Sequence, residues 1–201
     1  MNKEMIKQFF DDYAPTWDAE MIKSEEVVEK ILDNACVSEN VDVLDVACGT
    51  GVLFDNYINR KVSSIVGIDI SDAMIEIAKE KYLNDVSKNE GSDIELLCAD
   101  AEIFSSEKKF DVVMVYNAFP HFPNQRELIK NLASLLKEGG RLSIAHGMSR
   151  EKIIEHHSGA AKDVSLELLE AKELATLMSE FLSVNIILSN DEMYQVVGMK
   201  N

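Results

Sequence analysis

The sequence predicts an α/β fold built on a parallel sheet, and two patterns carry that prediction. From residue 41 onward, short apolar segments alternate with segments of helical length. Some short segments are apolar without a break, as in Val-Val-Met-Val at 112–115, and such runs are typical of strands buried on both faces of a parallel sheet. A chain of 201 residues is long enough for one α/β domain with a full core.

The predicted elements after residue 41 follow one another in regular order. Strands are predicted at about 41–46, 64–69, 93–98, 110–115, 140–146, 183–189 and 192–199. Helices are predicted at about 51–59, 71–84, 124–137, 150–157 and 167–181. Gly139 and Gly140 are expected to end the helix that precedes the fifth strand, because glycine is favoured just after a helix.

Two further helices are predicted ahead of the first strand. Residues 2–13 carry apolar side chains at helical spacing. Pro15 ends that helix, and Trp17 is expected in the following loop. A second helix begins at about Ser24, which suits an N-cap. Neither helix belongs to the strand-helix alternation, so residues 1–40 are expected to form a helical lid on the α/β core of residues 41–201.

Composition argues against several classes of protein. Twenty basic residues against thirty-six acidic ones give a formal net charge of −16, which repels the phosphate backbone of nucleic acids. Cys36, Cys48 and Cys98 are scattered, so neither a disulfide framework nor a thiolate zinc site is predicted. The first residues lack the apolar core of a signal peptide, and no run is long enough to span a membrane. We therefore expect a cytoplasmic protein without a nucleic-acid partner or a membrane span.

A glycine-rich turn follows the first predicted strand. Residues 43–51 (Val-Leu-Asp-Val-Ala-Cys-Gly-Thr-Gly) form an apolar strand interrupted by Asp45, then a turn that opens into a helix. Glycines bring bare peptide N–H groups close to a ligand, and ligands of open α/β sheets bind at the carboxyl ends of strands. The turn lacks the spacing of the dinucleotide and Walker motifs. We therefore expect binding of neither NAD(H) nor ATP.

Polar residues also follow the next three predicted strands. Asp69 closes the second strand, and a carboxylate there can accept hydrogen bonds from two ribose hydroxyls. Asp100 follows the third strand and could accept a hydrogen bond from an adenine amino group. Asn117 follows the fourth. These residues predict a nucleotide-like ligand at the carboxyl edge of the sheet.

Taken together, these segments resemble the class I S-adenosylmethionine-dependent methyltransferases. The matching segments are VLDVACGTG (43–51), GIDISDAMIEIAKEK (67–81), CADAEIF (98–104), FDVVMVYNAF (110–119) and LLKEGGRLSI (135–144). The segment FFDDYAPTWD (9–18) is similar to the start of the menaquinone/ubiquinone-biosynthesis branch of small-molecule methyltransferases, which shares the DVACGTG form. The resemblance implies a Rossmann-like sheet of seven strands, in the order 3-2-1-4-5-7-6, with the last strand antiparallel.

The resemblance also implies S-adenosyl-L-methionine as cofactor and S-adenosyl-L-homocysteine as product. The residues implied to bind the cofactor are Tyr13, Trp17, Asp45, Ala47, Cys48, Gly49, Gly51, Asp69, Ile70, Met74, Asp100, Ala101 and Asn117. The turn from Ala47 to Gly51 would hold the methionine half, Ile70 and Met74 would flank the adenine, and Asn117 would face the methyl group. For Tyr13 and Trp17, packing within the lid is an equal alternative.

The expected function is direct in-line methyl transfer to a small molecule, with an oxygen, sulfur, nitrogen or carbon atom as acceptor. The contrasting hypothesis is a protein that binds the cofactor without turning it over, as a sensor or an assembly factor. The residues expected to contact the acceptor are Phe119, His121, His146, Arg150 and His157. On the predicted 150–157 helix, Arg150 and His157 share one face while His156 points elsewhere. Arg150 would either meet an anionic acceptor or be an ordinary surface residue.

The histidines allow three hypotheses. His121 or His146 could act as a general base, because an imidazole titrates near neutral pH. Alternatively, His121, His146 and His157 could hold a divalent metal ion that activates the acceptor. In the third hypothesis, the histidines line the pocket without a chemical role. The sequence lacks a compact ligand pattern such as H-E-x-x-H that would favour the metal.

Overall fold

A seven-stranded sheet forms the centre of the computed structural model, which describes residues 1–84, 91–159 and 161–201. The strands are β1 (Asp42–Val46), β2 (Ser64–Asp69), β3 (Asp93–Cys98), β4 (Phe110–Tyr116), β5 (Leu136–His146), β6 (Ser183–Ser189) and β7 (Tyr194–Met199). Their order is β3-β2-β1-β4-β5-β7-β6. Strands β1 to β5 pair in parallel, and β7 is antiparallel to both of its neighbours. The predicted fold class and strand order are therefore confirmed.

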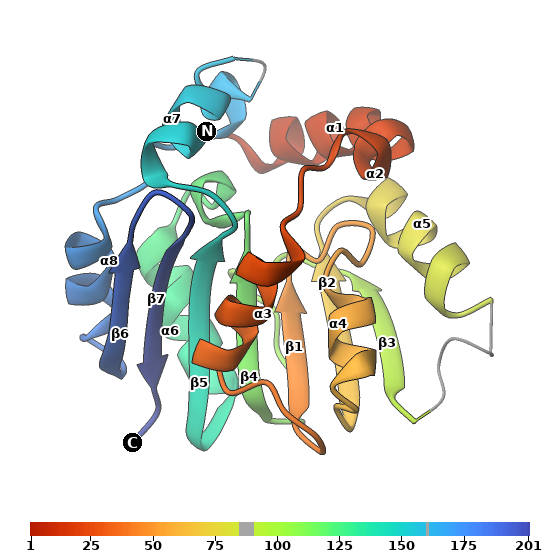
Figure 1. The fold of residues 1–201 in the computed structure, drawn as a ribbon. Coiled ribbons are helices and arrows are strands. Elements are labelled where there is room, and N and C mark those ends of the chain that lie inside the picture. The colour runs from red at the N-terminus through yellow and green to blue at the C-terminus, as the bar shows by residue number, and fades with distance from the viewer. Residues whose placement is uncertain (85–90, 160) are drawn as a thin grey trace.

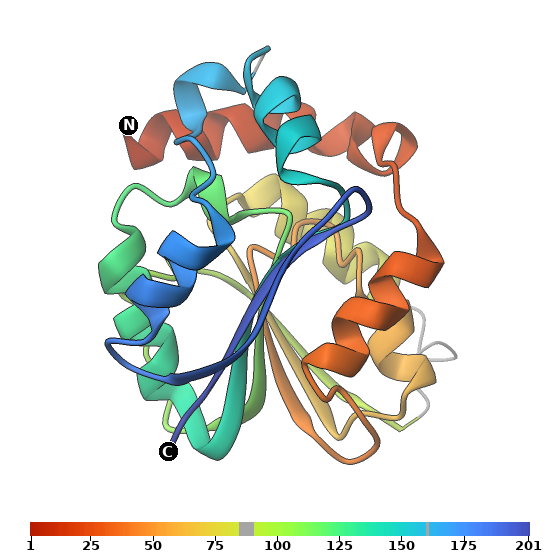
Figure 2. The same ribbon diagram turned by 60° about the vertical axis from the view of Figure 1, so that its left-hand side comes forward.

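Helices cover both faces of this sheet (Figures 1 and 2). One face carries α3 (Glu25–Asn34), α4 (Phe54–Asn59) and α5 (Asp72–Tyr82), and the other carries α6 (Gln125–Leu135) and α8 (Ala171–Met178). Successive strand residues point to opposite faces, so Val43 packs in the first core and its neighbour Leu44 in the second. Among the described residues, no helix combines the length and the hydropathy that crossing a lipid bilayer requires.

The N-terminal segment divides into a part above the sheet and a part within the core. Helix α1 (Lys3–Tyr13), a 3₁₀ turn (Ala14–Thr16) and α2 (Trp17–Glu20) lie across the carboxyl ends of the strands, near α7 (Arg150–His157), in both views of the ribbon. We call the segment from Lys3 to Glu20 the lid. Trp17 therefore begins a short helix and does not lie in a loop.

Helix α3 corrects the prediction that residues 1–40 form a lid. Val28 and Ile31 of this helix are fully buried against one face of the sheet. The side-chain amide of Gln195 in β7 donates to the carbonyl oxygen of Ile31 at 2.9 Å, which fixes the helix to the far half of the sheet. Its apolar stripe was recognised correctly, but periodicity alone does not say which surface such a stripe covers.

The two adjacent glycines also have a different role from the predicted one. Helix α6 ends at Leu135, and β5 begins at the next residue, so Gly139 and Gly140 lie within the strand. Gly139 has a φ of +75°, a conformation that residues with a Cβ atom rarely adopt. A Cβ atom on Gly140 would lie 2.9 Å from the carbonyl oxygen of Phe110. These glycines therefore accommodate an irregularity between β4 and β5 and do not end the helix.

Other predicted boundaries differ by a few residues. The helix expected at 167–181 is α8, which begins at Ala171 after an extended segment. The helix expected at 51–59 is α4, which begins at Phe54 after the glycine turn. In both cases the apolar pattern includes residues ahead of the helix: a turn at 51–53 before α4 and the extended segment before α8. Segment 71–84, by contrast, closely matches α5.

Candidate active site

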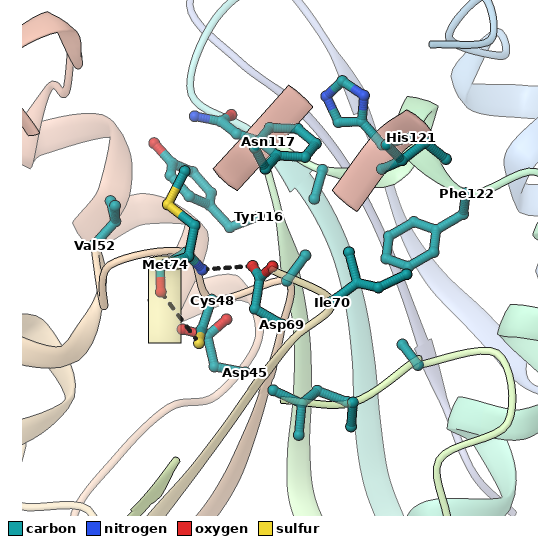
Figure 3. Close-up of a pocket in the computed structure, with 18 of the residues that line it drawn as sticks. Asp45, Cys48, Val52, Asp69, Ile70, Met74, Tyr116, Asn117, His121 and Phe122 are labelled. Atoms are coloured by element: carbon teal, nitrogen blue, oxygen red, sulfur yellow. Dashed lines mark hydrogen bonds between the residues drawn. The ribbon is translucent and has the colours of Figure 1, made fainter. Parts of the chain in front are cut away.

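A cavity lies at the carboxyl ends of β1, β2 and β4, beneath the lid, and contains about 920 Å³ of unfilled space that is partly open to solvent. We call it the strand-end cavity. Figure 3 shows Asp45, Asp69 and Met74 at one end of it and Asn117 and His121 at the other. The residues predicted to bind the cofactor that line it are Trp17, Asp45, Ala47, Cys48, Gly49, Asp69, Ile70, Met74, Asp100, Ala101 and Asn117. The two that do not line it are Tyr13 and Gly51.

The glycine turn is shaped by residues with positive φ. Gly49 has a φ of +56° and Gly51 a φ of +86°, and Ala47 adopts a φ of 55°. An alanine in this left-handed region costs roughly 1 kcal/mol. A Cβ atom on Gly51 would lie 2.6 Å from the Tyr82 ring, so Gly51 is required for packing behind the turn. That position explains why it does not line the cavity.

The Asp69 carboxylate organises the backbone around the cavity. Its Oδ2 accepts the N–H of Gly49 at 2.9 Å, and its Oδ1 accepts the N–H of Ser71 at 2.9 Å. Only 7% of Asp69 is exposed, and burial raises its pKa to about 6. Each carboxylate oxygen has capacity for a further hydrogen bond. The group can therefore bind a pair of hydroxyls, as the ribose role requires.

Asp45 lies deeper in the same cavity. It is 2% exposed, and burial raises its pKa to about 8, with the charge of Asp69 acting in the same direction. A carboxyl group with this pKa is mostly protonated at neutral pH and can donate a hydrogen bond. The two strand-end acids of β1 and β2 thus hold different protonation states within one cavity.

Lys3 is a lining residue that the sequence analysis missed. Its ammonium group lies 2.6 Å from Asp100 Oδ2 and 2.6 Å from Glu102 Oε2. Asp100 therefore meets a lid residue in this structure, as well as lining the strand-end cavity. The first contact joins residues 97 positions apart, and nothing in the local pattern around Lys3 signals it.

Further polar contacts hold the lid to the loops after β1 and β2. Lys7 Nζ lies 2.7 Å from Asp72 Oδ2. The Asp11 carboxylate accepts the Ser71 hydroxyl at 2.6 Å, and the hydroxyl of Thr50 donates to the Asp18 carboxylate. The lid is thus anchored to the same two loops that form the floor of the cavity.

A second cavity adjoins the first, and we call it the lid cavity. It is lined by the lid, by the segments after β4 and β5, and by α7. Residues that line both cavities are Phe10, Trp17, Met21, Asn117 and His121. Tyr13 lines the lid cavity only, which places it away from the strand ends. The two cavities therefore meet at a junction made by these five residues.

The predicted acceptor-side residues divide into two groups. His121, His146 and His157 line the lid cavity, whereas Phe119 and Arg150 do not. Phe119 is fully buried in the core. His156 lines the cavity as well, so the predicted assignment of helix faces in α7 was wrong on this point.

Arg150 forms ion pairs and a hydrogen bond with the segment before α8. Its guanidinium lies 2.9 Å from Glu170 and 3.2 Å from Glu167, and its Nε donates to the carbonyl oxygen of Leu168 at 2.9 Å. The guanidinium thus joins α7 to the segment before α8. Because these partners are distant in sequence, helix periodicity could not reveal them.

His121 has a defined orientation. Its Nδ1 lies 2.9 Å from the carbonyl oxygen of Val164, which can only accept, so Nδ1 carries the proton and Nε2 of the neutral ring keeps its lone pair. Burial lowers the pKa of His121 to about 4. The ring is therefore neutral at pH 7 and offers an acceptor atom at the junction of the cavities.

His146 lies at the end of β5. It is 2% exposed, and its Nε2 is buried without a hydrogen-bond partner in the described part of the chain. Burial lowers its pKa to about 3, and burial likewise lowers the pKa of His157 to about 4. Three of the rings around the lid cavity are therefore neutral at pH 7.

The metal hypothesis gains no support from this arrangement. Over residues 1–84, 91–159 and 161–201, no group of three or more His, Cys, Asp or Glu side chains could hold a metal ion. The rings of His121 and His157 lie 5.0 Å apart between centroids, and Nδ1 of His121 is bound to the backbone.

Comparison with known proteins finds similarity to methyltransferases. A family described as "Methyltransferase domain" matches residues 43–140. Malonyl-[acyl-carrier protein] O-methyltransferase of Priestia megaterium is 27% identical over 146 residues, covering 71% of this chain and 51% of that protein. Ubiquinone biosynthesis O-methyltransferase of Coxiella burnetii is 27% identical over 148 residues, covering 71% of this chain and 61% of that protein. The chain thus spans about half to three-fifths of these relatives.

Solved structures share the fold. Magnesium protoporphyrin IX methyltransferase from Synechocystis, with bound S-adenosylhomocysteine, superposes with a TM-score of 0.72 at 14% identity, and the match covers 100% of both chains. The N-methyltransferase NodS from Bradyrhizobium japonicum, also with S-adenosylhomocysteine, gives 0.72 at 14% identity, with 97% and 98% covered. At this identity the likeness establishes the architecture alone.

Proposed function

We propose that this chain, which belongs to the class I S-adenosylmethionine-dependent methyltransferases, transfers the methyl group of that cofactor to a small molecule bound in the lid cavity. The observation that carries the proposal is the junction of the two cavities. Five residues, among them Asn117 and His121, line both. A donor in the strand-end cavity and an acceptor in the lid cavity would meet there.

The residues that line the strand-end cavity suit the cofactor in their chemistry. Asp69 has spare acceptor capacity for two ribose hydroxyls, and Ile70 and Met74 offer apolar surfaces to an adenine ring. Gly49 lines this cavity with a φ of +56°, and a Cβ there would lie 3.6 Å from Trp17 Nε1 and 3.9 Å from the Met74 sulfur. Glycine thus keeps the turn free of a side chain on this side of the cavity, where the methionine half would bind.

The cofactor supplies a methyl group on a sulfonium, which is already a good leaving group. The chain must therefore align the acceptor, exclude water and, for a protonated acceptor, remove a proton. We assign proton removal to His121, because its Nε2 keeps a lone pair at the junction while Nδ1 is fixed by Val164. The lid would exclude water, since Phe10 and Trp17 line both cavities.

Asn117 is fixed in position at the junction by hydrogen bonds. Its φ is 54°, its side-chain Oδ1 accepts the N–H of Gly147 at 2.9 Å, and its own N–H donates to Ala145 at 2.9 Å. These bonds tie the segment after β4 to the end of β5. A rigid junction supports alignment, on which proximity catalysis depends.

The test is incubation of the purified protein with methyl-labelled S-adenosylmethionine and a metabolite extract of the source cells. We expect a labelled small molecule, and its structure would identify the accepting atom. Calorimetry with S-adenosylhomocysteine, with NADH as the matched control, measures cofactor binding separately. Binding without any labelled product would favour the sensor, and heat with NADH but none with S-adenosylhomocysteine would contradict the proposal.

A further inference from the structure

The lid cavity is built largely from aromatic and apolar side chains. Phe9, Phe10, Tyr13 and Trp17 approach it from the lid, and the Phe9 and Tyr13 rings lie 4.6 Å apart between centroids. At its mouth, Ile22 is 84% exposed. An exposed isoleucine beside an aromatic wall suits a ligand with an apolar, ring-containing body.

Positive charge is absent from the described lining of this cavity. Its single formally charged residue there is Glu20, and the four histidines are the other titratable groups besides Tyr13. Two cations of the lid and of α7 are engaged elsewhere: Arg150 pairs with Glu167 and Glu170, and Lys3 with Asp100 and Glu102. A carboxylate acceptor would lose its hydration without gaining an ion pair.

The imidazoles of His121 and His146 define which hydrogen-bonding group fits. His121 offers a lone pair at Nε2 and needs a donor, because its Nδ1 proton is already given to Val164. His146 also lines this cavity, and its Nε2 is buried with no partner among the described residues. A carboxylate cannot donate to His121, whereas a hydroxyl group both donates and accepts and can therefore satisfy either ring.

We propose that the acceptor is an uncharged aromatic alcohol, of the phenol class, whose hydroxyl is bound between His121 and His146. The proposal rests on the proposed function and names its substrate class. An oxygen acceptor is consistent with the names of both relatives, which are O-methyltransferases. A phenol differs from the malonyl group that the name of the Priestia megaterium relative gives.

The corresponding step balances as a direct displacement. The phenolic oxygen forms a bond to the methyl carbon, the carbon–sulfur bond breaks, and its electron pair stays on sulfur, which leaves as the thioether. The phenolic proton passes to Nε2 of His121. A weakly basic imidazole is sufficient, because an oxygen that gains a methyl group before losing its proton is strongly acidic.

The test measures binding rather than turnover. Calorimetry at pH 7.5 compares 4-butylphenol, 4-butylbenzoate and 4-butylaniline, which share ring and chain and differ in the polar group. Each is titrated into the full-length protein with and without saturating S-adenosylhomocysteine. We expect the phenol to bind at least tenfold more tightly than both others in at least one of the two conditions. A smaller preference in both, or a preference for benzoate or aniline, overturns the inference.

The two proposals fail separately in this design. Absence of heat with S-adenosylhomocysteine contradicts the proposed function. The ranking of the three compounds, which can be measured without the cofactor, decides the acceptor class.

A pair of variants at exposed residues tests the charge of the lid cavity without changing the core. Ile22→Arg adds a positive charge at the exposed mouth and should tighten benzoate binding at least threefold. Ile103→Arg, at a residue that is 78% exposed and lines neither cavity, should leave it unchanged.

The role of His146 has its own readout. In the wild-type protein, 4-butylphenol should bind at least tenfold more tightly than its methyl ether, which has no proton to donate. In His146→Phe that ratio should fall at least threefold, with the near-ultraviolet circular dichroism spectrum retained. An unchanged ratio in the folded variant, or equal effects of Ile22→Arg and Ile103→Arg on benzoate, would contradict the binding mode.

Discussion

The strand-end cavity and the lid cavity share five residues but are built in opposite ways. The first is formed by the ends of β1, β2 and β4, with carboxyl groups such as Asp45 and Asp69 fixed by the sheet. The second is formed by the lid, by α7 and by the segments at the ends of β4 and β5, with aromatic rings and neutral imidazoles. Under the proposed function, the sheet edge would hold the cofactor, and the surfaces above it would select the acceptor.

The difference extends to charge. Asp69 keeps its backbone hydrogen bonds and a pKa of about 6, while burial holds His121 and His146 neutral with pKa values of about 4 and 3. If the two cavities serve donor and acceptor as proposed, changes on one side should spare binding on the other. The following predictions test that separation.

The largest effect is expected for His121→Phe, which removes the proton acceptor and keeps an aromatic ring at the junction. Methyl transfer should fall by about 10²- to 10⁴-fold, the usual contribution of general base catalysis. The affinity for S-adenosylhomocysteine, measured by calorimetry, should change little. His156→Phe, at an exposed histidine of the same cavity, is the matched control. Methyl transfer by His121→Phe within about threefold of the wild type would remove the base from this position.

The next effect is expected for Asp69→Ala on cofactor binding. Hydrogen bonds to a charged group contribute about 1.5–3 kcal/mol, so the dissociation constant for S-adenosylhomocysteine should rise by about ten- to a hundredfold. The control is Asp93→Ala, at the exposed first residue of β3. Affinity for the acceptor analogues in the absence of cofactor should persist. An unchanged dissociation constant in Asp69→Ala would take this carboxylate out of the site.

A pH effect on stability is expected from His146. Its folded-state pKa of about 3 lies below the ordinary value of 6.5, so the unfolded chain binds the proton more tightly. The free energy of unfolding should therefore fall as the pH drops below about 6.5, by about 2 kcal/mol between pH 7 and pH 5 from this residue. Urea unfolding at both pH values should show a smaller loss in His146→Gln. His156→Gln should keep the wild-type pH dependence, and equal pH dependence in all three proteins would contradict the burial of this ring.

The smallest effect concerns the anchoring of the lid. Lys7→Met removes the contact from α1 to Asp72, and partly exposed ion pairs contribute about 0.2–1 kcal/mol. The affinity for S-adenosylhomocysteine should therefore fall by at most about fivefold. Lys79→Met is the control, since Lys79 pairs with Glu76 within α5. Equal affinities in the two variants would mean that this contact does not support binding.

Trp17, the single tryptophan of the chain, reports on both sides of the comparison because it lines both cavities. Its emission should change on addition of S-adenosylhomocysteine and again on addition of an acceptor analogue. Fluorescence that responds to neither ligand would contradict the position of the lid over the site.

Much of the strand-end cavity could be predicted from the sequence. Asp69 and Asp100 were identified because each follows an apolar strand, and parallel strands bring their carboxyl ends to one edge. Gly51 was assigned to the ligand, but its φ and the nearby Tyr82 ring show that the turn itself requires it. A sequence motif alone cannot distinguish a glycine whose backbone contacts a ligand from one that leaves space for a neighbouring side chain.

Residues that act over long sequence distances were the ones missed or misplaced. Lys3 meets Asp100, and Arg150 meets Glu167 and Glu170. Helical periodicity describes a face of one helix, but it carries no information on the partner of that face. For this reason the pairing of Arg150 and the place of His156 in the cavity lining could not be foreseen.

The sequence by itself determined the strands and the acids at their ends, because both depend on local periodicity and on a regular alternation of elements. The strand order followed from the resemblance to a known family. The tertiary structure alone decided which helices cover the core and which lie above the cavities. It also decided the junction, since Phe10 of the lid meets Asn117 and His121, which lie more than a hundred positions later in the chain. Burial there sets the imidazoles neutral, and burial is a property of the packed fold.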